Sequence, residues 1–402
     1  MSELLSSAVE STGPSTADDL QAPPPSGLLS SVGGAEAAAA ALATQLFAQA
    51  PHSDQPGGFP TAEFAWLRSA GLLVAPLPVS LGGVGLGAPT HTHALLSTLR
   101  HIGRGNLAVG RVYEGHVNAL QLLQRFGRPE QVSQWAADAR AGHLFGVWNT
   151  EAQDGVHLES LPNGRYRLRG SKTFASGAGH VTRPLLTGAL PDGSWQMLIL
   201  PADEKHPTLD GSFWRPLGMQ ATASFRADFT GLEVGPAELL GQPGDYYRQP
   251  WFSGGAIRFA AVQLGGAESV FDETRRFLRA LHRTDDPYQR QRLGEMALLT
   301  ESGGQWLRAA ADYVAQLTAP TAEATVAHAN MVRTAIAEIC QRMLPLAEQC
   351  VGARGFLKPE PFERLHRDLT HYLRQPAPDA AQADAGRFVL QHSAPAYCLW
   401  HD

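Results

Sequence analysis

Apolar residues recur at helical spacing through the first third of the chain. The segment 35–50 is rich in alanine and favours a helix, and a second helix is predicted to begin at Pro60. A glycine-rich loop covers 80–87. Further helices are predicted over 91–103 and 106–125, and FGRPEQ (126–131) ends the second of these and starts another. These segments predict a helical N-terminal domain over 34–142.

Near residue 144 the pattern changes, and apolar residues then recur at every second position. In ASFRADF (223–229) the residues Ala223, Phe225, Ala227 and Phe229 share one face, with polar residues between them. Further strands are predicted over 166–170 and 194–201, and Asn163-Gly164 and Asp192-Gly193 are typical of hairpin turns. The alternation predicts a central β-barrel or sandwich domain over 143–243.

From residue 254 the helical period returns. A broad apolar stripe starts at Ile257, and Gly265-Gly266 within it indicates the close approach of another backbone. Three more helices are predicted, over 288–318, over 321–350 and from Pro361 to about Leu373. The fold class is therefore α+β, with a C-terminal four-helix bundle over 244–375 and an extension over 376–402. Residues 1–33 are rich in Ser, Pro and Gly and predict a disordered tail.

Charge and cysteine usage narrow the classes of function. The 402 residues carry a formal net charge of −6, which gives no electrostatic reason to expect nucleic acid or an anionic membrane as a partner. Cys340, Cys350 and Cys398 form no CxxC pair, so neither a disulfide framework nor a metal site is implied. Without an apolar span or a signal peptide in the sequence, we expect a cytoplasmic protein.

Four short motifs follow one another on this architecture: WNTEAQDG (148–155), GSKTFASGAG (170–179), QCVGARGF (349–356) and FERLHRDL (362–369). In type and order they resemble the motifs of the acyl-CoA dehydrogenase-like flavoproteins. The resemblance covers about residues 35–375. It departs from the family pattern at Ala152, where a proline is usual, and at Ala353, where a glycine is usual.

The resemblance implies FAD as the cofactor. Trp148 and Thr150 belong to the loop that meets the flavin pyrimidine edge, Phe174 to the surface under the flavin ring, and Ala175 and Ser176 to the N5 side. In the family, Arg283, Gln349 and Gly352 correspond to positions that contact the FAD pyrophosphate. The Phe-Gly that normally follows Arg283 is missing from a shortened loop. Arg258, which opens a bundle helix, corresponds to an arginine near the substrate.

The general base of the family reaction is missing. The resemblance places its glutamate at one of two positions, which here are Pro376 and Ile257, and neither side chain can accept a proton. Asp379 is the remaining catalytic candidate if its loop takes a different path. The helix histidines His116 and His371 are interpreted as structural or surface residues, with an acid-base role for His116 as the alternative.

Three functions follow from the resemblance. The main interpretation is an FAD-dependent oxidoreductase of acyl-CoA dehydrogenase type that acts on the CH–CH group of an acyl thioester, carried by CoA or a carrier protein. An electron-acceptor protein is then a further partner. The alternative is a flavin-dependent monooxygenase on the same fold, which the sequence FASG and the missing glutamates favour. The third is a catalytically silent flavin- or thioester-binding homologue. For all three, the resemblance implies a homodimer or homotetramer.

Overall fold

The computed structural model describes residues 29–315 and 322–400. The helices are α1 (Val32–Ser53), α2 (Thr61–Ser69), α3 (Thr92–Gly105), α4 (Leu107–Phe126), α5 (Pro129–Ala141), α6 (Ala202–Lys205), α7 (Trp251–Gly254), α8 (Ala256–Ala280), α9 (Pro287–Ala315), α10 (Ala322–Gly355), α11 (Phe362–Tyr372) and α12 (Pro378–Gln391). The strands are β1 (Phe145–Trp148), β2 (His157–Ser160), β3 (Tyr166–Arg169), β4 (Ser171–Ala175), β5 (Arg183–Ala189), β6 (Trp195–Ile199), β7 (Thr208–Asp210), β8 (Phe225–Asp228), β9 (Glu233–Val234) and β10 (Leu239–Leu240).

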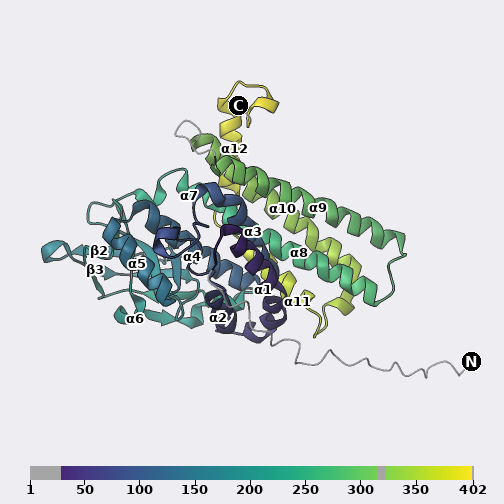
Figure 1. Ribbon diagram of the computed structural model, residues 1–402, viewed down its shortest axis with the longest axis horizontal. Helices are drawn as coiled ribbons and strands as arrows, with labels where there is room; N and C mark the ends of the chain where they lie inside the picture. The colour runs from purple at the N-terminus through teal and green to yellow at the C-terminus, as the bar shows by residue number, and fades with distance from the viewer. Residues whose placement is uncertain (1–28, 316–321, 401–402) are drawn as a thin grey trace, which may run out of the picture.

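The predicted α+β architecture is confirmed. Figure 1 shows the strands at one end of the molecule, the long helices α8, α9 and α10 at the other, and α3 and α4 between them. Most of the tail predicted over 1–33 falls outside the described residues, and α1 already begins at Val32. The last positions of the helix predicted over 288–318 also fall outside the described residues, after Ala315. The domain boundaries given above remain predictions.

The central β region contains two sheets within the described residues. One has the strand order β10-β6-β5-β2-β3-β9 with β1 parallel to β5, and the other has the order β4-β8-β7. Both predicted hairpins form, with β2 antiparallel to β3 around Asn163-Gly164 and β5 antiparallel to β6 around Asp192-Gly193. Asn163 and Gly164 have φ angles of 62° and 67°, which a tight hairpin turn requires.

The strand predicted over 223–229 is shorter than expected. Ala223 has a left-handed φ of 43° at the end of a 3-10 turn, Gln220–Thr222, so β8 begins only at Phe225. Ala227 and Phe229 are fully buried, as the alternation predicted. The turn in front of β8 brings the Thr222 hydroxyl to that of Ser224, and the Ser224 hydroxyl to that of Ser176 after β4.

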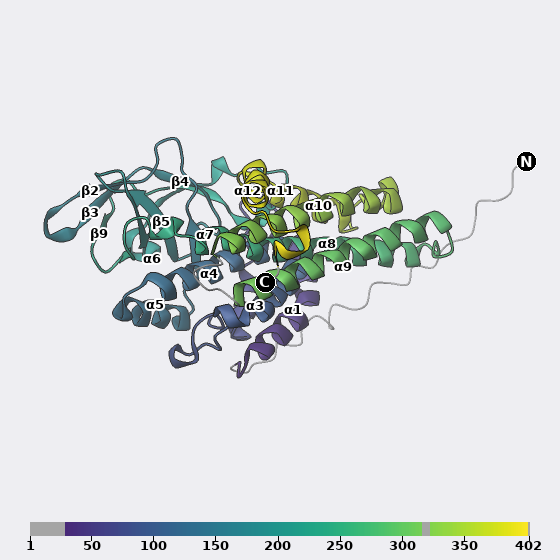
Figure 2. The ribbon, with the colours of Figure 1, turned by 90° about the horizontal axis from the view of Figure 1, so that it is seen from above.

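The bundle packs against the N-terminal helices through close backbone contacts. A Cβ atom on Gly265 would lie 2.1 Å from the Arg100 carbonyl oxygen, and one on Gly103 would lie 2.4 Å from that of Val262. This confirms the predicted close approach at Gly265-Gly266, since only glycine lets α3 and α8 cross at this separation. The predicted extension contains α12, which packs on α10. Figure 2 shows α11 and α12 on the side of the bundle opposite to α1.

His116 joins α4 to its neighbours. Its Nε2–H donates to the Leu73 carbonyl at 2.7 Å, and its Nδ1 accepts from the Phe145 backbone N–H at 3.0 Å. Both ring nitrogens are satisfied and the side chain is fully buried. Burial lowers the pKa of His116 to about 4. This supports the structural interpretation of the residue.

We expect His116→Gln to lower the free energy of unfolding by about 1–3 kcal/mol at pH 7.5, because the substitution disturbs two buried hydrogen bonds. Between pH 6.5 and pH 4 the unfolded state binds a proton at His116 and the native state does not, so acid destabilises the wild type through this group. The stability difference between wild type and variant should therefore shrink as the pH falls. Urea unfolding at several pH values measures it, with exposed His157→Gln as the control. A difference that is constant with pH would contradict the assignment.

Candidate functional site

A bulge in β4 turns Phe174 out of the sheet. Lys172 pairs with Ala227 and Ala175 with Phe225, so β4 carries one extra residue between these pairs. Phe174 has a left-handed φ of 51° and is 47% exposed. Such a conformation is costly for an aromatic residue and is typical of functional sites. The residues that follow are small, and Gly177 and Gly179 also have left-handed φ angles.

Aromatic side chains surround Phe174 at its edges. The Phe213 ring lies 5.4 Å away and the Trp214 ring 6.1 Å away between centroids, both nearly perpendicular to the Phe174 ring. Trp214 in turn contacts the ring of His371 on α11 at 5.4 Å. These contacts fix the orientation of Phe174 while leaving its ring about half exposed, which suits stacking by a planar ligand.

The predicted loop with Thr150 runs beside β4. The Thr173 backbone N–H donates to the Thr150 carbonyl at 2.9 Å, and the Thr173 hydroxyl donates to the Glu151 carbonyl at 3.2 Å. Lys172 is completely buried and forms an ion pair with Glu151. Burial lowers the pKa of Lys172, and Glu151 opposes that shift. The exposed Thr150 is therefore held on a rigid segment next to Phe174.

Ser176 lies at the end of β4 and is almost buried. Its carbonyl accepts a hydrogen bond from the Trp148 indole at 2.9 Å, and its hydroxyl lies 2.9 Å from that of Ser224. The Ser224 hydroxyl is 2.7 Å from that of Thr222. The Trp148 and Ala175 side chains are both buried in the core, and the cofactor contacts predicted for these two residues stay predictions.

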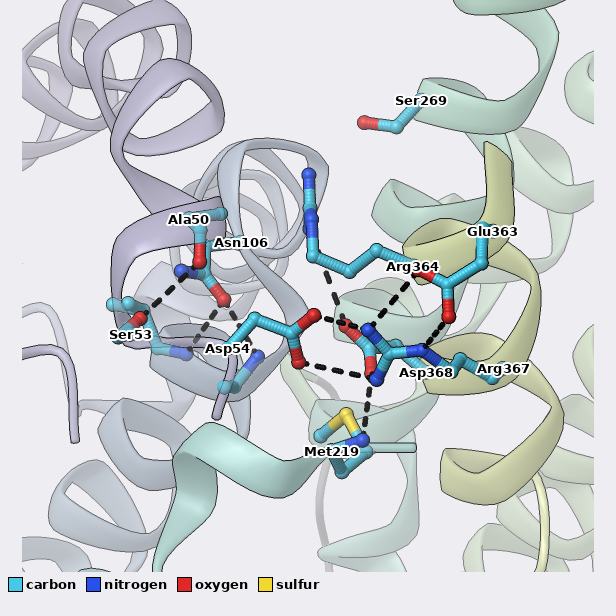
Figure 3. Close-up of polar contacts among 12 residues, drawn as sticks. Ala50, Ser53, Asp54, Asn106, Met219, Ser269, Glu363, Arg364, Arg367 and Asp368 are labelled. Carbon is cyan, nitrogen blue, oxygen red and sulfur yellow. Dashed lines mark hydrogen bonds and ion pairs between the residues drawn. The ribbon is translucent and has the colours of Figure 1, made fainter. Parts of the chain in front are cut away.

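A cluster of charged residues ties α11 to the site (Figure 3). The Met219 backbone N–H donates to Asp368 Oδ1 at 2.6 Å, and Met219 has a left-handed φ of 63°. Beside it, Arg367 forms a bidentate ion pair with Asp54 after α1, and Arg364 lies 4.0 Å from Asp368. Burial raises the pKa of Asp368 to about 6, against the opposing hydrogen bond from Met219 and the two arginines. The sequence alone did not predict this contact, although Asp368 belongs to the motif FERLHRDL (362–369).

Arg258, the predicted substrate contact, is held by a carboxylate that the sequence reasoning missed. Its Nε donates to Glu114 Oε1 at 3.0 Å, and the other oxygen of Glu114 lies 3.3 Å from Arg111 Nη1. A cavity of about 330 Å³ opens beside this pair between α3, α4, α7 and α8. Among the residues that line it are Thr92, Leu95, Gln121, Trp251, Ile257 and Arg258.

The other predicted residues lie away from Phe174. Arg283 is exposed in the connection between α8 and α9, at the end of the bundle far from the strands in Figure 1. Gln349 and Gly352 are exposed near the end of α10, and Gln349 accepts a hydrogen bond from Arg292 at 3.1 Å. Asp379 is exposed in the first turn of α12. The roles assigned to these four residues stay predictions.

The groups gathered around Phe174 fit a flavin ring. They comprise the half-exposed Phe174 ring on β4, the polar loop with Thr150 beside β4, and the buried Ser176 hydroxyl directly after β4. A planar ring with polar edges needs such a flat apolar face and fixed hydrogen-bonding groups at its rim. The fit concerns the ring only, and it is the same for any flavin.

Comparison with known proteins agrees with this reading. The model of the acyl-CoA dehydrogenase N-terminal domain matches residues 35–143, and that of the acyl-CoA dehydrogenase C-terminal domain matches residues 245–372. The chain is 26% identical to the dibenzothiophene monooxygenase of Mycolicibacterium goodii over 379 residues, covering 85% of this chain and 90% of that protein. It is also 26% identical to the probable FMNH2-dependent monooxygenase SfnC of Pseudomonas putida over 385 residues, covering 88% and 94% of the two chains.

Among solved structures, FMN-bound TdsC of Paenibacillus sp. A11-2 is similar with a TM-score of 0.82 and 23% identity, covering 91% of this chain and 99% of that one. The predicted cofactor FAD is therefore wrong for this branch, since that relative binds FMN and SfnC is named for FMNH2. The contacts of Arg283, Gln349 and Gly352 were predicted for the FAD pyrophosphate, and they stay predictions. These relatives also favour the oxygenase alternative over the dehydrogenase interpretation.

No helix in the described ranges 29–315 and 322–400 combines the length and apolar character needed to cross a membrane.

We expect Phe174→Gly to change the free energy of unfolding by no more than about 1 kcal/mol. The substitution removes a half-exposed ring and relieves the left-handed conformation, and these effects oppose each other. The fully buried Phe229→Ala is the matched comparison and should cost about 3–5 kcal/mol. Urea unfolding of both variants makes the test. Equal losses would show that Phe174 is a core residue and not a ligand-facing one.

Proposed function

Since the chain belongs to the acyl-CoA dehydrogenase-like flavoprotein superfamily, we propose that it is a flavin-dependent monooxygenase that uses reduced FMN and molecular oxygen. The observation that carries this proposal is the loss of the base at both family positions. Ile257 is a buried apolar residue in the cavity wall, and Pro376 is an exposed residue before α12. A dehydrogenase must remove a proton from the substrate's α carbon, and neither side chain can do so. The monooxygenase relatives support the same choice.

The residues around β4 would hold the flavin ring. Phe174 would offer its ring face, Thr150 would meet the pyrimidine edge, and Ser176 would offer its hydroxyl to N5. When bound, reduced flavin supplies two electrons to O2, so that one oxygen atom enters the substrate and the other leaves as water. The protein contributes orientation and exclusion of water, which the buried Trp148 and the aromatic neighbours of Phe174 provide.

The cavity beside α4 and α8 would take the substrate. Its volume of about 330 Å³ lies at the lower end of the range for small-molecule sites. The walls combine apolar residues such as Leu95 and Trp251 with the polar Gln121 and Arg258. Glu114 supplies one negative charge against the two guanidinium groups of Arg258 and Arg111, and Arg125 also lines the cavity, so this wall keeps a net positive charge. The volume therefore suits a compact organic molecule better than an extended acyl thioester.

The test is whether turnover needs oxygen or a thioester. We expect a purified sample supplied with FMN, a flavin reductase and NADH to oxidise a compact aromatic or organosulfur substrate only when O2 is present. Ser176→Ala should reduce this coupled oxidation by about 10- to 100-fold, whereas Ser160→Ala on the exposed surface of β2 should not change it. Product formation is followed by mass spectrometry with ¹⁸O2.

An anaerobic titration with a panel of acyl-CoA thioesters provides the opposite outcome. Bleaching of the flavin absorbance by a thioester, without O2, would identify a dehydrogenase and contradict the proposal. A protein that binds no flavin in any redox state would instead be a silent homologue.

A further inference from the structure

Three hydroxyl groups form one chain that ends on a backbone carbonyl. Ser176 Oγ lies 2.9 Å from Ser224 Oγ, Ser224 Oγ lies 2.7 Å from Thr222 Oγ1, and Thr222 Oγ1 lies 2.9 Å from the Met219 carbonyl oxygen. The side chains of Ser224 and Thr222 are 3% and 1% exposed, so water does not readily substitute for either contact. The three hydroxyl groups and the Met219 carbonyl therefore satisfy one another's hydrogen bonds without water.

The number of available hydrogens fixes which group donates in each of these three hydrogen bonds. A serine or threonine hydroxyl has one hydrogen to donate, whereas a backbone carbonyl oxygen only accepts. Three hydrogens must serve three contacts, and the contact with Met219 requires that Thr222 donates. Ser224 must then donate to Thr222, and Ser176 must donate to Ser224. Any other arrangement leaves one of these buried contacts without a hydrogen, which costs about 1–3 kcal/mol.

The carbonyl at the end of the chain is itself fixed. Met219 has a left-handed backbone, its N–H is bound by Asp368, and its carbonyl also accepts from the Thr222 backbone N–H at 3.0 Å. A Cβ atom on Gly218 would lie 2.1 Å from the Arg367 carbonyl oxygen, so α11 presses directly on this turn. The Met219 carbonyl therefore keeps its position, and each hydroxyl group keeps its role as donor to the next one.

We propose that Thr222 and Ser224 are positioning residues that make Ser176 a hydrogen-bond acceptor toward its ligand. The Ser176 hydrogen is used inside the protein, so only lone pairs remain for a group placed against its oxygen. This inference rests on the proposed function. The flavin N5 atom carries a hydrogen when the flavin is reduced and only a lone pair when it is oxidised. A Ser176 that accepts therefore favours reduced FMN over oxidised FMN.

Equilibrium binding of both redox states tests this directly. Dissociation constants for oxidised FMN are measured in air by quenching of flavin fluorescence, and those for dithionite-reduced FMN by anaerobic ultrafiltration. We expect the wild type to bind reduced FMN at least tenfold more tightly. By linkage, a tenfold preference raises the midpoint potential of bound FMN by about 30 mV for two electrons, which spectroelectrochemistry checks independently.

Thr222→Val keeps the shape of the side chain but removes the hydrogen that fixes the chain, and Ser224→Ala removes the acceptor of Ser176. In both variants the Ser176 hydroxyl becomes free to donate, so the preference for reduced FMN should fall by about tenfold. Thr222→Ser should retain the wild-type preference. Thr98→Val removes a buried hydroxyl from α3, which bonds only the Ala94 carbonyl, and should leave the preference unchanged.

The outcomes separate the two proposals. Suppose that the wild type binds FMN but Thr222→Val and Ser224→Ala keep its preference for reduced FMN. The assignment of Ser176 as a hydrogen-bond acceptor is then overturned, and the proposed function stands. The same holds if the wild type binds both redox states equally. If the wild type binds FMN in neither state, the proposed function fails as well. A single cooperative melting transition in each variant shows that the variants are folded.

Discussion

The hydrogen bond from the Met219 backbone N–H to the buried Asp368 carboxylate is the constraint on which the site depends. It joins α11 of the bundle to the turn in front of β8, and the neighbouring ion pair of Arg367 with Asp54 joins both to the end of α1. Three regions of the chain thus meet at one buried carboxylate. The turn holds a residue in a left-handed conformation, which persists because the surrounding contacts determine it. The hydrogen bonds that orient the Ser176 hydroxyl end on this fixed turn.

The proposed oxygen chemistry rests on the groups around Phe174 and on the missing base in the cavity. The ring face, the rigid Thr150 loop and the Ser176 hydroxyl serve any enzyme that places a flavin on this sheet. The distinction between branches of the superfamily lies in the cavity, where Ile257 offers no base and Glu114 is occupied by two arginines. We therefore propose oxygen chemistry for this site, because neither family position offers a base for a carbon-bound proton.

Local patterns predicted the fold well, because helical and alternating periods and the hairpin signals Asn163-Gly164 and Asp192-Gly193 report on neighbouring residues. The roles of Phe174 and Ser176 rest on one short motif and stay predictions. The Asp368–Met219 contact joins residues 149 positions apart, and the Arg258–Glu114 pair joins residues 144 positions apart. A helical or alternating pattern carries no information about contacts between residues so far apart in the sequence. FAD was predicted wrongly because the motifs around the ring are shared, while FAD and FMN differ only beyond it.

The central claim is that a flavin ring lies on Phe174 with Ser176 at its N5 side. A crystal structure of the full chain soaked anaerobically with reduced FMN measures this most directly. The account predicts the ring stacked against Phe174, with N5 about 3 Å from Ser176 Oγ. A flavin bound elsewhere, or a ring turned so that N5 faces away from Ser176, would contradict it.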